Sequence, residues 1–81
     1  MENIMITKMC APLPGIFYRK NSPDEPPFFE DGAIIISGSI IGLVETMKSF
    51  FPITSDVSGK IKFLVENGSV VDADQPIAEI G

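Results

Sequence analysis

The fold is decided by the stretch Glu30-Asp31-Gly32-Ala33-Ile34-Ile35, because its pattern returns later in the chain as Glu66-Asn67-Gly68-Ser69-Val70-Val71. The segments before these two copies, Pro14-Gly15-Ile16-Phe17 and Ser58-Gly59-Lys60-Ile61, also match each other. Each copy joins turn formers to short runs of β-branched and aromatic residues, which favour strands. Two similar halves that each bury one face against the other predict a flattened β-sandwich or barrel with a quasi-two-fold internal repeat.

The two copies differ in the spacing of their glycines. Gly15 and Gly32 are 17 positions apart, whereas Gly59 and Gly68 are 9 apart, so the first copy carries eight extra residues. These are most economically Lys20-Asn21-Ser22-Pro23-Asp24-Glu25-Pro26-Pro27, whose prolines and polar side chains cannot continue a paired strand. We expect residues 20–27 to form a loop that projects from the β-domain.

Turn-forming clusters cut the chain into short apolar runs, and these predict eight strands with almost no helix. The runs are residues 4–6, 16–18, 33–36, 40–44, 50–53, 60–65, 70–71 and 77–80. Gly15, Gly32, Gly59 and Gly68 are expected to form turns that need positive φ. A chain of 81 residues is large enough for one domain at most, so we expect a single all-β domain, a flattened eight-stranded sandwich or barrel, over residues 1–81.

Composition excludes several classes of function. The net charge of −5 comes from scattered acidic residues, which disfavours nucleic acid and anionic membranes as partners. Neither a signal peptide nor a membrane span is present in the sequence, and the single cysteine excludes an internal disulfide, so we expect a cytoplasmic protein. The chain has no histidine, which excludes a His-based triad and a His zinc site.

Asp24 and Glu25 are the only feature that resembles a pair of acid–base carboxylates. They lie in the predicted loop with no His, Cys or Gly-rich phosphate loop beside them. We therefore predict no catalytic residues and no metal site in this chain.

The motif that can carry chemistry is Glu45-Thr46-Met47-Lys48, between the apolar pairs Leu43-Val44 and Phe50-Phe51. A lysine between two apolar strands is best placed in a turn, where its ammonium group stays solvated. We expect a hairpin over residues 44–50 that lies far from the chain termini. Met47 is either a packing residue or a recognition element, and Glu45 is either a solvated charge at a strand end or a recognition element.

The pattern Glu-X-Met-Lys on a hairpin resembles the attachment motif of biotinyl domains, in which Ala usually precedes Met. The resemblance extends over nearly the whole chain. It includes Ala11-Pro12-Leu13-Pro14-Gly15-Ile16-Phe17-Tyr18-Arg19, Ser22-Pro23-Asp24, Phe29-Glu30-Asp31-Gly32, Asp56-Val57-Ser58-Gly59, Leu64-Val65-Glu66-Asn67-Gly68 and Asp74-Gln75-Pro76-Ile77. The chain thus resembles the biotinyl and lipoyl attachment domain family, and within it the biotin carboxyl carriers, whose extra loop is called the thumb. Residues 20–27 correspond to that thumb. Thr46 departs from the usual Ala.

The resemblance implies that a biotin protein ligase attaches biotin to the ε-amine of Lys48 and recognises Glu45, Thr46 and Met47 at the hairpin tip. A biotin carboxylase would then load a carboxyl group, and a carboxyltransferase would accept it. By this resemblance the setting is an acetyl-CoA carboxylase-type complex that makes malonyl-CoA for fatty acid synthesis. The chain itself would be a non-catalytic carrier, whose tether raises the effective concentration of the group.

Two other functions fit the same fold. A lipoyl carrier shares the fold and the lysine at the tip, but its motif typically has Asp or another residue in place of Met, and it lacks the thumb. The second alternative is a binding module that has lost the modification.

Overall fold

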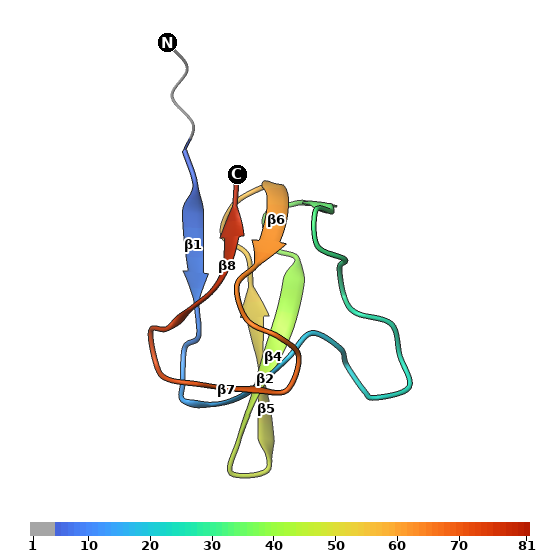
Figure 1. Cartoon of the computed structure of the whole chain (residues 1–81), viewed down its shortest axis with the longest axis vertical. Helices are drawn as coiled ribbons and strands as arrows, with labels where there is room; N and C mark the ends of the chain where they lie inside the picture. The colour runs from blue at the N-terminus through green and yellow to red at the C-terminus, as the bar shows by residue number, and fades with distance from the viewer. Residues whose placement is uncertain (1–4) are drawn as a thin grey trace.

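The computed structural model describes residues 5–81, and these form eight β-strands and no helix. The strands are β1 Thr7–Cys10, β2 Gly15–Tyr18, β3 Ile34–Ile35, β4 Ile40–Thr46, β5 Ser49–Thr54, β6 Gly59–Phe63, β7 Ser69–Val71 and β8 Pro76–Ile80. They form two antiparallel four-stranded sheets with the orders β1-β8-β6-β3 and β5-β4-β2-β7 (Figure 1). The predicted eight-stranded, flattened all-β sandwich is confirmed.

The internal repeat is a true structural two-fold. Each strand of the first half has a mate in the second half: β1 matches β5, β2 matches β6, β3 matches β7 and β4 matches β8. Exchanging every strand for its mate converts the strand order of one sheet into that of the other. The hydrogen bonds follow the same rule: Gly32 N–H donates to the Ile61 carbonyl, and Gly68 N–H donates to the Phe17 carbonyl, both at 2.7 Å. The predicted quasi-two-fold symmetry is therefore present in the backbone itself.

The core lies between the two sheets and is built from pairs of residues that the two-fold relates. Inward-facing side chains alternate with outward-facing ones along β6, as the period of two requires, whereas residues 41–44 of the central strand β4 are all buried. The fully buried pairs are Phe17 with Ile61, Ile35 with Val71, Ile41 with Ile77 and Val44 with Ile80. Both halves therefore contribute equally to one core, and neither half can bury its apolar face alone.

One core pair is asymmetric, and a glycine compensates for it. Phe17 is larger than its mate Ile61, and a Cβ added at Gly42 would lie 2.5 Å from the Phe17 ring. The mate of Gly42 is Ala78, which is also fully buried. The larger Phe17 side chain in β2 thus occupies the space that a side chain at Gly42 in β4 would need.

Two local expectations were wrong. Ile4, in the predicted first strand, lies outside the described residues, while Met5 and Ile6 are exposed and belong to no strand. The first strand begins at Thr7, because its register with β8 places Thr7 opposite Ile80, the last residue of that strand.

Gly15 does not have the positive φ that was expected, although Gly32, Gly59 and Gly68 do. A Cβ at Gly15 would overlap the carbonyl oxygen of Glu45. Gly15 is therefore needed for the close approach of β2 to β4 rather than for a turn.

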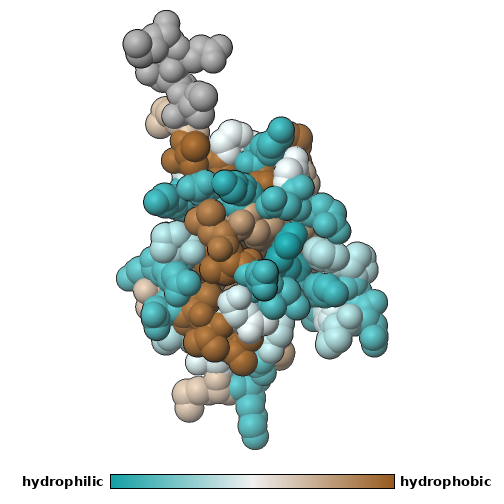
Figure 2. Space-filling view, in the orientation of Figure 1, coloured by the Kyte–Doolittle hydropathy of each residue, from teal (hydrophilic) through white to brown (hydrophobic). Residues whose placement is uncertain are grey.

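The surface carries several exposed apolar side chains. Met47 lies in the β4–β5 turn, and Ile34 and Val70 lie in the edge strands β3 and β7. Figure 2 shows part of the apolar surface as a band with polar residues on both sides. Within residues 5–81, no helix is long and apolar enough to cross a membrane.

Candidate functional site

The β4–β5 hairpin carries the candidate site at its tip. Thr46 pairs with Ser49 as the last pair of the ladder, so Met47 and Lys48 alone form the turn. Both have positive φ, 49° for Met47 and 66° for Lys48. A two-residue connection with φ > 0 at both positions is a type I′ turn, whose twist matches that of the flanking strands.

This turn is unusual because neither residue suits it. Type I′ turns favour Asn-Gly, and an L-residue with a side chain pays about 1–2 kcal/mol in the left-handed region. The cost is met by the long β4–β5 ladder, where β-branched and aromatic residues favour the extended backbone on both sides. Met47 is 94% exposed, so packing does not explain its presence. Strain and an exposed apolar side chain at one position point to a functional constraint.

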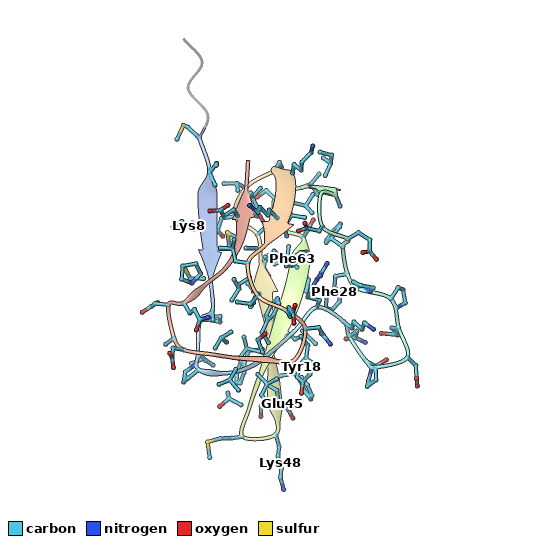
Figure 3. All side chains as sticks on the ribbon, in the orientation of Figure 1. Lys8, Tyr18, Phe28, Glu45, Lys48 and Phe63 are labelled. Atoms are coloured by element: carbon cyan, nitrogen blue, oxygen red, sulfur yellow. The ribbon has the colours of Figure 1, made fainter. Side chains whose placement is uncertain are left out.

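Lys48 projects into solvent from the end of the hairpin. Figure 3 shows its side chain pointing away from the body, and Figure 1 shows the start of β1 and the C-terminus at the opposite end. Within residues 5–81, the hairpin therefore lies far from both ends of the described chain, as predicted. The carboxylate closest in sequence, Glu45, is turned to another partner, so it does not hold the lysine.

Glu45 lies in β4 rather than in the turn, and its side chain contacts the neighbouring strand. The Tyr18 hydroxyl donates a hydrogen bond of 2.9 Å to Glu45 Oε1. This bond, then burial and the negative charge of Glu45, raise the pKa of Tyr18 above 10.0. The Tyr18 ring also lies 6.2 Å from the ring of Phe50, which pairs with Glu45 across the hairpin. Glu45 is thus a partly buried structural contact and not a free charge at a strand end.

Residues 20–27 form a loop whose two legs meet at the body. Lys20 and Pro27 form an isolated antiparallel bridge, and within the loop Glu25 N–H donates to the Ser22 carbonyl at 3.1 Å. Figure 1 shows the loop extending to one side of the sandwich. We call residues 20–27 the thumb.

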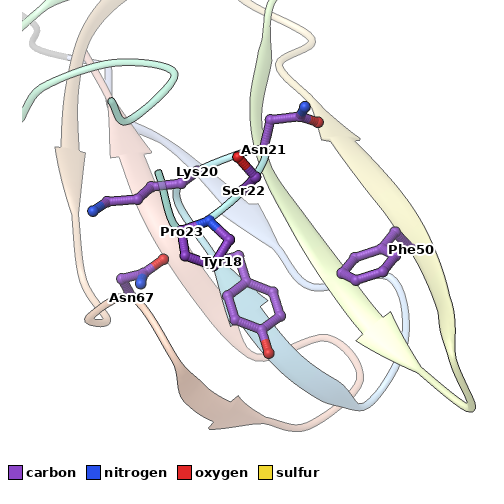
Figure 4. A pocket seen from close by; sticks show the side chains of 7 residues that line it. All are labelled: Tyr18, Lys20, Asn21, Ser22, Pro23, Phe50 and Asn67. Carbon is purple, nitrogen blue, oxygen red and sulfur yellow. The ribbon is translucent and has the colours of Figure 1, made fainter. Parts of the chain in front are cut away.

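A cavity of about 460 Å³ lies between the thumb and the hairpin. Its lining residues come from three separate parts of the chain (Figure 4): Tyr18, Lys20, Asn21, Ser22, Pro23, Phe50 and Asn67. Its size falls at the lower end of the range found for small-molecule sites. The thumb and β5, the strand that follows Lys48, therefore line the same cavity.

Sequence reasoning did not find Tyr18, Phe50 or Asn67 as parts of this site. They are separated from the thumb or from one another along the chain. The pairing of β2 with β4 and of β4 with β5 brings Phe50 to Tyr18, and the pairing of β2 with β7 brings Asn67. Asn67 did leave one signal, since it aligns with Asp31 in the internal repeat.

Comparison with known proteins places the chain in a family. The family model described as "Biotin-requiring enzyme" matches residues 7–80, and the chain belongs to this family of biotin and lipoyl attachment domains.

Several relatives are more specific. The chain is 38% identical over 76 residues to the biotin carboxyl carrier protein of acetyl-CoA carboxylase from Nostoc sp., and the aligned segment covers 93% of this chain and 42% of the relative. It is 44% identical over 71 residues to the protein of the same name from Pseudomonas aeruginosa, covering 86% and 46%. A chloroplastic relative from Arabidopsis thaliana is 38% identical over 68 residues, covering 83% and 27%. The chain spans less than half the length of these relatives.

Proposed function

We propose that Lys48 carries covalently bound biotin and that the domain transports carboxyl groups between two partner active sites. The observation that carries this proposal is the β4–β5 turn. It holds an exposed lysine next to a 94% exposed methionine, with both residues in a backbone conformation that neither favours. Membership of the biotin and lipoyl attachment family supports the same chemistry.

The residues of the tip have distinct roles in this proposal. Lys48 provides the amine that a biotin protein ligase acylates. Since an ordinary lysine is protonated at neutral pH, the ligase must remove a proton before the amine can attack. Met47 and Thr46 offer the ligase an apolar contact and a specific turn shape. Glu45 positions the turn through the bond from Tyr18 to its Oε1, and the second oxygen of its carboxylate can still accept a hydrogen bond from the ligase.

The structure fits a tethered group of this kind. Lys48 is exposed at the end of a rigid two-stranded ladder, so a group attached there can reach an active site while the body of the domain stays outside. When bound, biotin supplies a ureido nitrogen that accepts and releases a carboxyl group. The chain contributes tethering and orientation, which raise the effective concentration of the group at each partner.

The thumb has a place in this function. Its first half, residues 20–23, forms one wall of the cavity of about 460 Å³, and Phe50 of the lysine hairpin forms part of another. We propose that the thumb contacts either the group on Lys48 or a partner enzyme at this cavity. Prolines restrict the loop, as expected for a recognition element rather than a random linker.

The proposed partners are a biotin protein ligase, a biotin carboxylase and a carboxyltransferase, in an acetyl-CoA carboxylase-type complex. The names of the relatives from Nostoc sp. and Pseudomonas aeruginosa support this setting. Fatty acid synthesis would be the pathway that uses the product.

A carboxyl relay assay tests the proposal. Biotinylated protein is mixed with purified biotin carboxylase, carboxyltransferase, ATP, labelled bicarbonate and acetyl-CoA, and malonyl-CoA is measured. We expect product with wild-type protein and none with Lys48→Arg. Equal product from both proteins would contradict the proposal.

Intact mass separates the proposal from its two rivals. The protein is expressed once with a biotin protein ligase and once with a lipoyl ligase. A biotinyl group only with the former supports a biotin carrier. A lipoyl group only with the latter identifies a lipoyl carrier, and an unchanged mass in both identifies a binding module.

A further inference from the structure

Arg19 stands at the point where β2 ends and the thumb begins. Its two-fold mate is Phe63, and the two side chains meet. The Cζ atom of Arg19 lies 4.0 Å from the centre of the Phe63 ring, which places the guanidinium over the ring face. A cation–π contact of this kind is favourable, and more so when water is partly excluded.

The same arginine also contacts the segment that directly follows the thumb. Its Nη2 donates a hydrogen bond to the Phe29 carbonyl at 3.2 Å, and its own carbonyl accepts one from Phe28 N–H at 2.9 Å. Arg19 therefore directly precedes the thumb, contacts Phe28 and Phe29 just after it, and packs on β6 of the opposite sheet.

The backbone of Arg19 is held as well. Its N–H donates to Asn67 Oδ1 at 2.7 Å, and the mate of this bond runs from Phe63 N–H to Asp31 Oδ1, also at 2.7 Å. The symmetric backbone bonds are present in both halves. The guanidinium contact has no symmetric counterpart, because the mate of Arg19 is Phe63 itself.

An energetic cost accompanies this side chain. Within residues 5–81, Arg19 Nε is buried and has no hydrogen-bond partner. A buried N–H without a partner is unfavourable, and an apolar residue of similar length would avoid that cost. An apolar residue could pack on Phe63 but could not donate to the Phe29 carbonyl. A lysine could not combine planar stacking with that bond.

We infer that Arg19 is the positioning residue of the thumb. Its guanidinium locks both legs of the loop to Phe63 and so keeps the cavity between the thumb and Phe50 formed. The consequence for carboxyl transfer rests on the proposed carrier function, whereas the lock itself is a property of the unmodified protein.

Amide hydrogen exchange of the unmodified protein tests the lock. The probe is the amide of Phe28, the residue that follows the thumb, and the reference is the core amide of Ile61, which donates to the Ala33 carbonyl at 2.9 Å. The variant is Arg19→Met, and the control is Lys62→Met, which removes the same charge from an exposed position in β6. We expect exchange at Phe28 to rise at least about fivefold in Arg19→Met only, with Ile61 unchanged.

Phe63→Leu provides an independent variant. It should raise the Phe28 rate selectively, and the double variant should exchange no faster than Arg19→Met alone, because Phe63→Leu removes only the stacking contact that Arg19→Met has already removed. The inference is overturned if Phe28 exchanges no faster in Arg19→Met than in the control. It is also overturned if Ile61 accelerates as much as Phe28, since Arg19 would then stabilise the whole domain rather than the thumb.

Biotinylation and carboxyl transfer separate this inference from the proposed function. Arg19→Met should be biotinylated at the wild-type rate, because the β4–β5 turn is untouched, but should give less product in the relay assay. Wild-type protein that cannot be biotinylated would contradict the carrier function and leave the exchange result intact. Full carboxyl transfer by a variant with a loosened thumb would show that thumb position does not matter for transfer.

Discussion

The Tyr18 hydroxyl donates a hydrogen bond of 2.9 Å to Glu45 Oε1. Tyr18 is the last residue of β2, just before the arginine that leads into the thumb, and Glu45 lies in β4, shortly before the turn that holds Lys48. The bond therefore ties the two parts of the candidate site together at one point. A substitution at either residue should therefore alter the environment of the other.

The first prediction concerns the titration of Tyr18. Its pKa is raised, first by the hydrogen bond to Glu45 and then by burial and the Glu45 charge. Because the folded-state pKa lies above the ordinary value of 10.0, the stability from this contact is fully present below pH 10 and is lost as pH rises through the folded-state pKa. Tyr18 is the only tyrosine, so absorbance reports on it alone. We expect Glu45→Gln to move the midpoint towards 10.0, and Glu66→Gln to leave it in place. The Gln amide can still accept the hydrogen bond but carries no charge, so an unchanged midpoint in Glu45→Gln would show that the Glu45 charge does not act on Tyr18 in solution.

The second prediction separates stability from recognition at the turn. Met47→Asn should stabilise the domain by about 1 kcal/mol, because Asn tolerates the left-handed region and Met47 makes little buried contact. The same change should slow biotinylation about tenfold, because it removes an exposed apolar contact for the ligase. Thermal unfolding and initial labelling rates provide the two readouts. Val70→Asn, at another exposed apolar position, is the control and should label normally. If Met47→Asn is labelled as fast as wild type, Met47 has no part in recognition.

The third prediction uses the internal symmetry. Asn67 Oδ1 accepts from Arg19 N–H, as its mate Asp31 accepts from Phe63 N–H. Asn67→Asp keeps the acceptor and should change the free energy of unfolding by less than about 0.5 kcal/mol, whereas Asn67→Ala should cost about 1–2 kcal/mol. Urea unfolding of the three proteins gives the comparison. Equal losses in both variants would show that the amide group, and not the acceptor oxygen, matters here.

The fourth prediction is that the domain folds without residues 20–27. The deletion joins Arg19 directly to Phe28, as Phe63 is joined to Leu64 in the other half. Phe29 and its mate Val65 both pack against the core, so the register of the shortened segment should be kept. We expect cooperative unfolding with a stability change of about 1 kcal/mol or less, and normal biotinylation with weaker carboxyl transfer. A deletion variant that fails to fold would show that the thumb is part of the folding unit.

Much of the fold could be predicted because each copy of the repeat is marked by a short, contiguous motif of turn formers and apolar residues. Gly32 and Gly68 mark equivalent turns, and the apolar runs around them became strands β3 and β7. The lysine hairpin followed from the same local patterning, since Lys48 lies between two apolar strands.

The contacts that assemble the site could not be predicted in this way. Tyr18 and Glu45 are 27 positions apart, and Arg19 meets Phe63 across the two-fold, so no local pattern reveals either contact. The type I′ turn was also hidden, because Met-Lys lacks the Asn-Gly signature of that turn. Gly15 was misinterpreted for a related reason: its need for close strand approach depends on the position of Glu45, which only the pairing of β2 with β4 determines.

Peptide mapping of the ligase-treated protein tests the central claim most directly. Wild-type protein and Lys48→Arg are each incubated with biotin protein ligase, ATP and biotin, digested, and analysed by mass spectrometry. We predict one biotinyl group on the wild-type peptide that contains Lys48. We predict none anywhere in Lys48→Arg, although Lys8, Lys20, Lys60 and Lys62 remain. Biotin on any of those four lysines in the variant, or an unmodified Lys48 in the wild-type protein, would contradict the account.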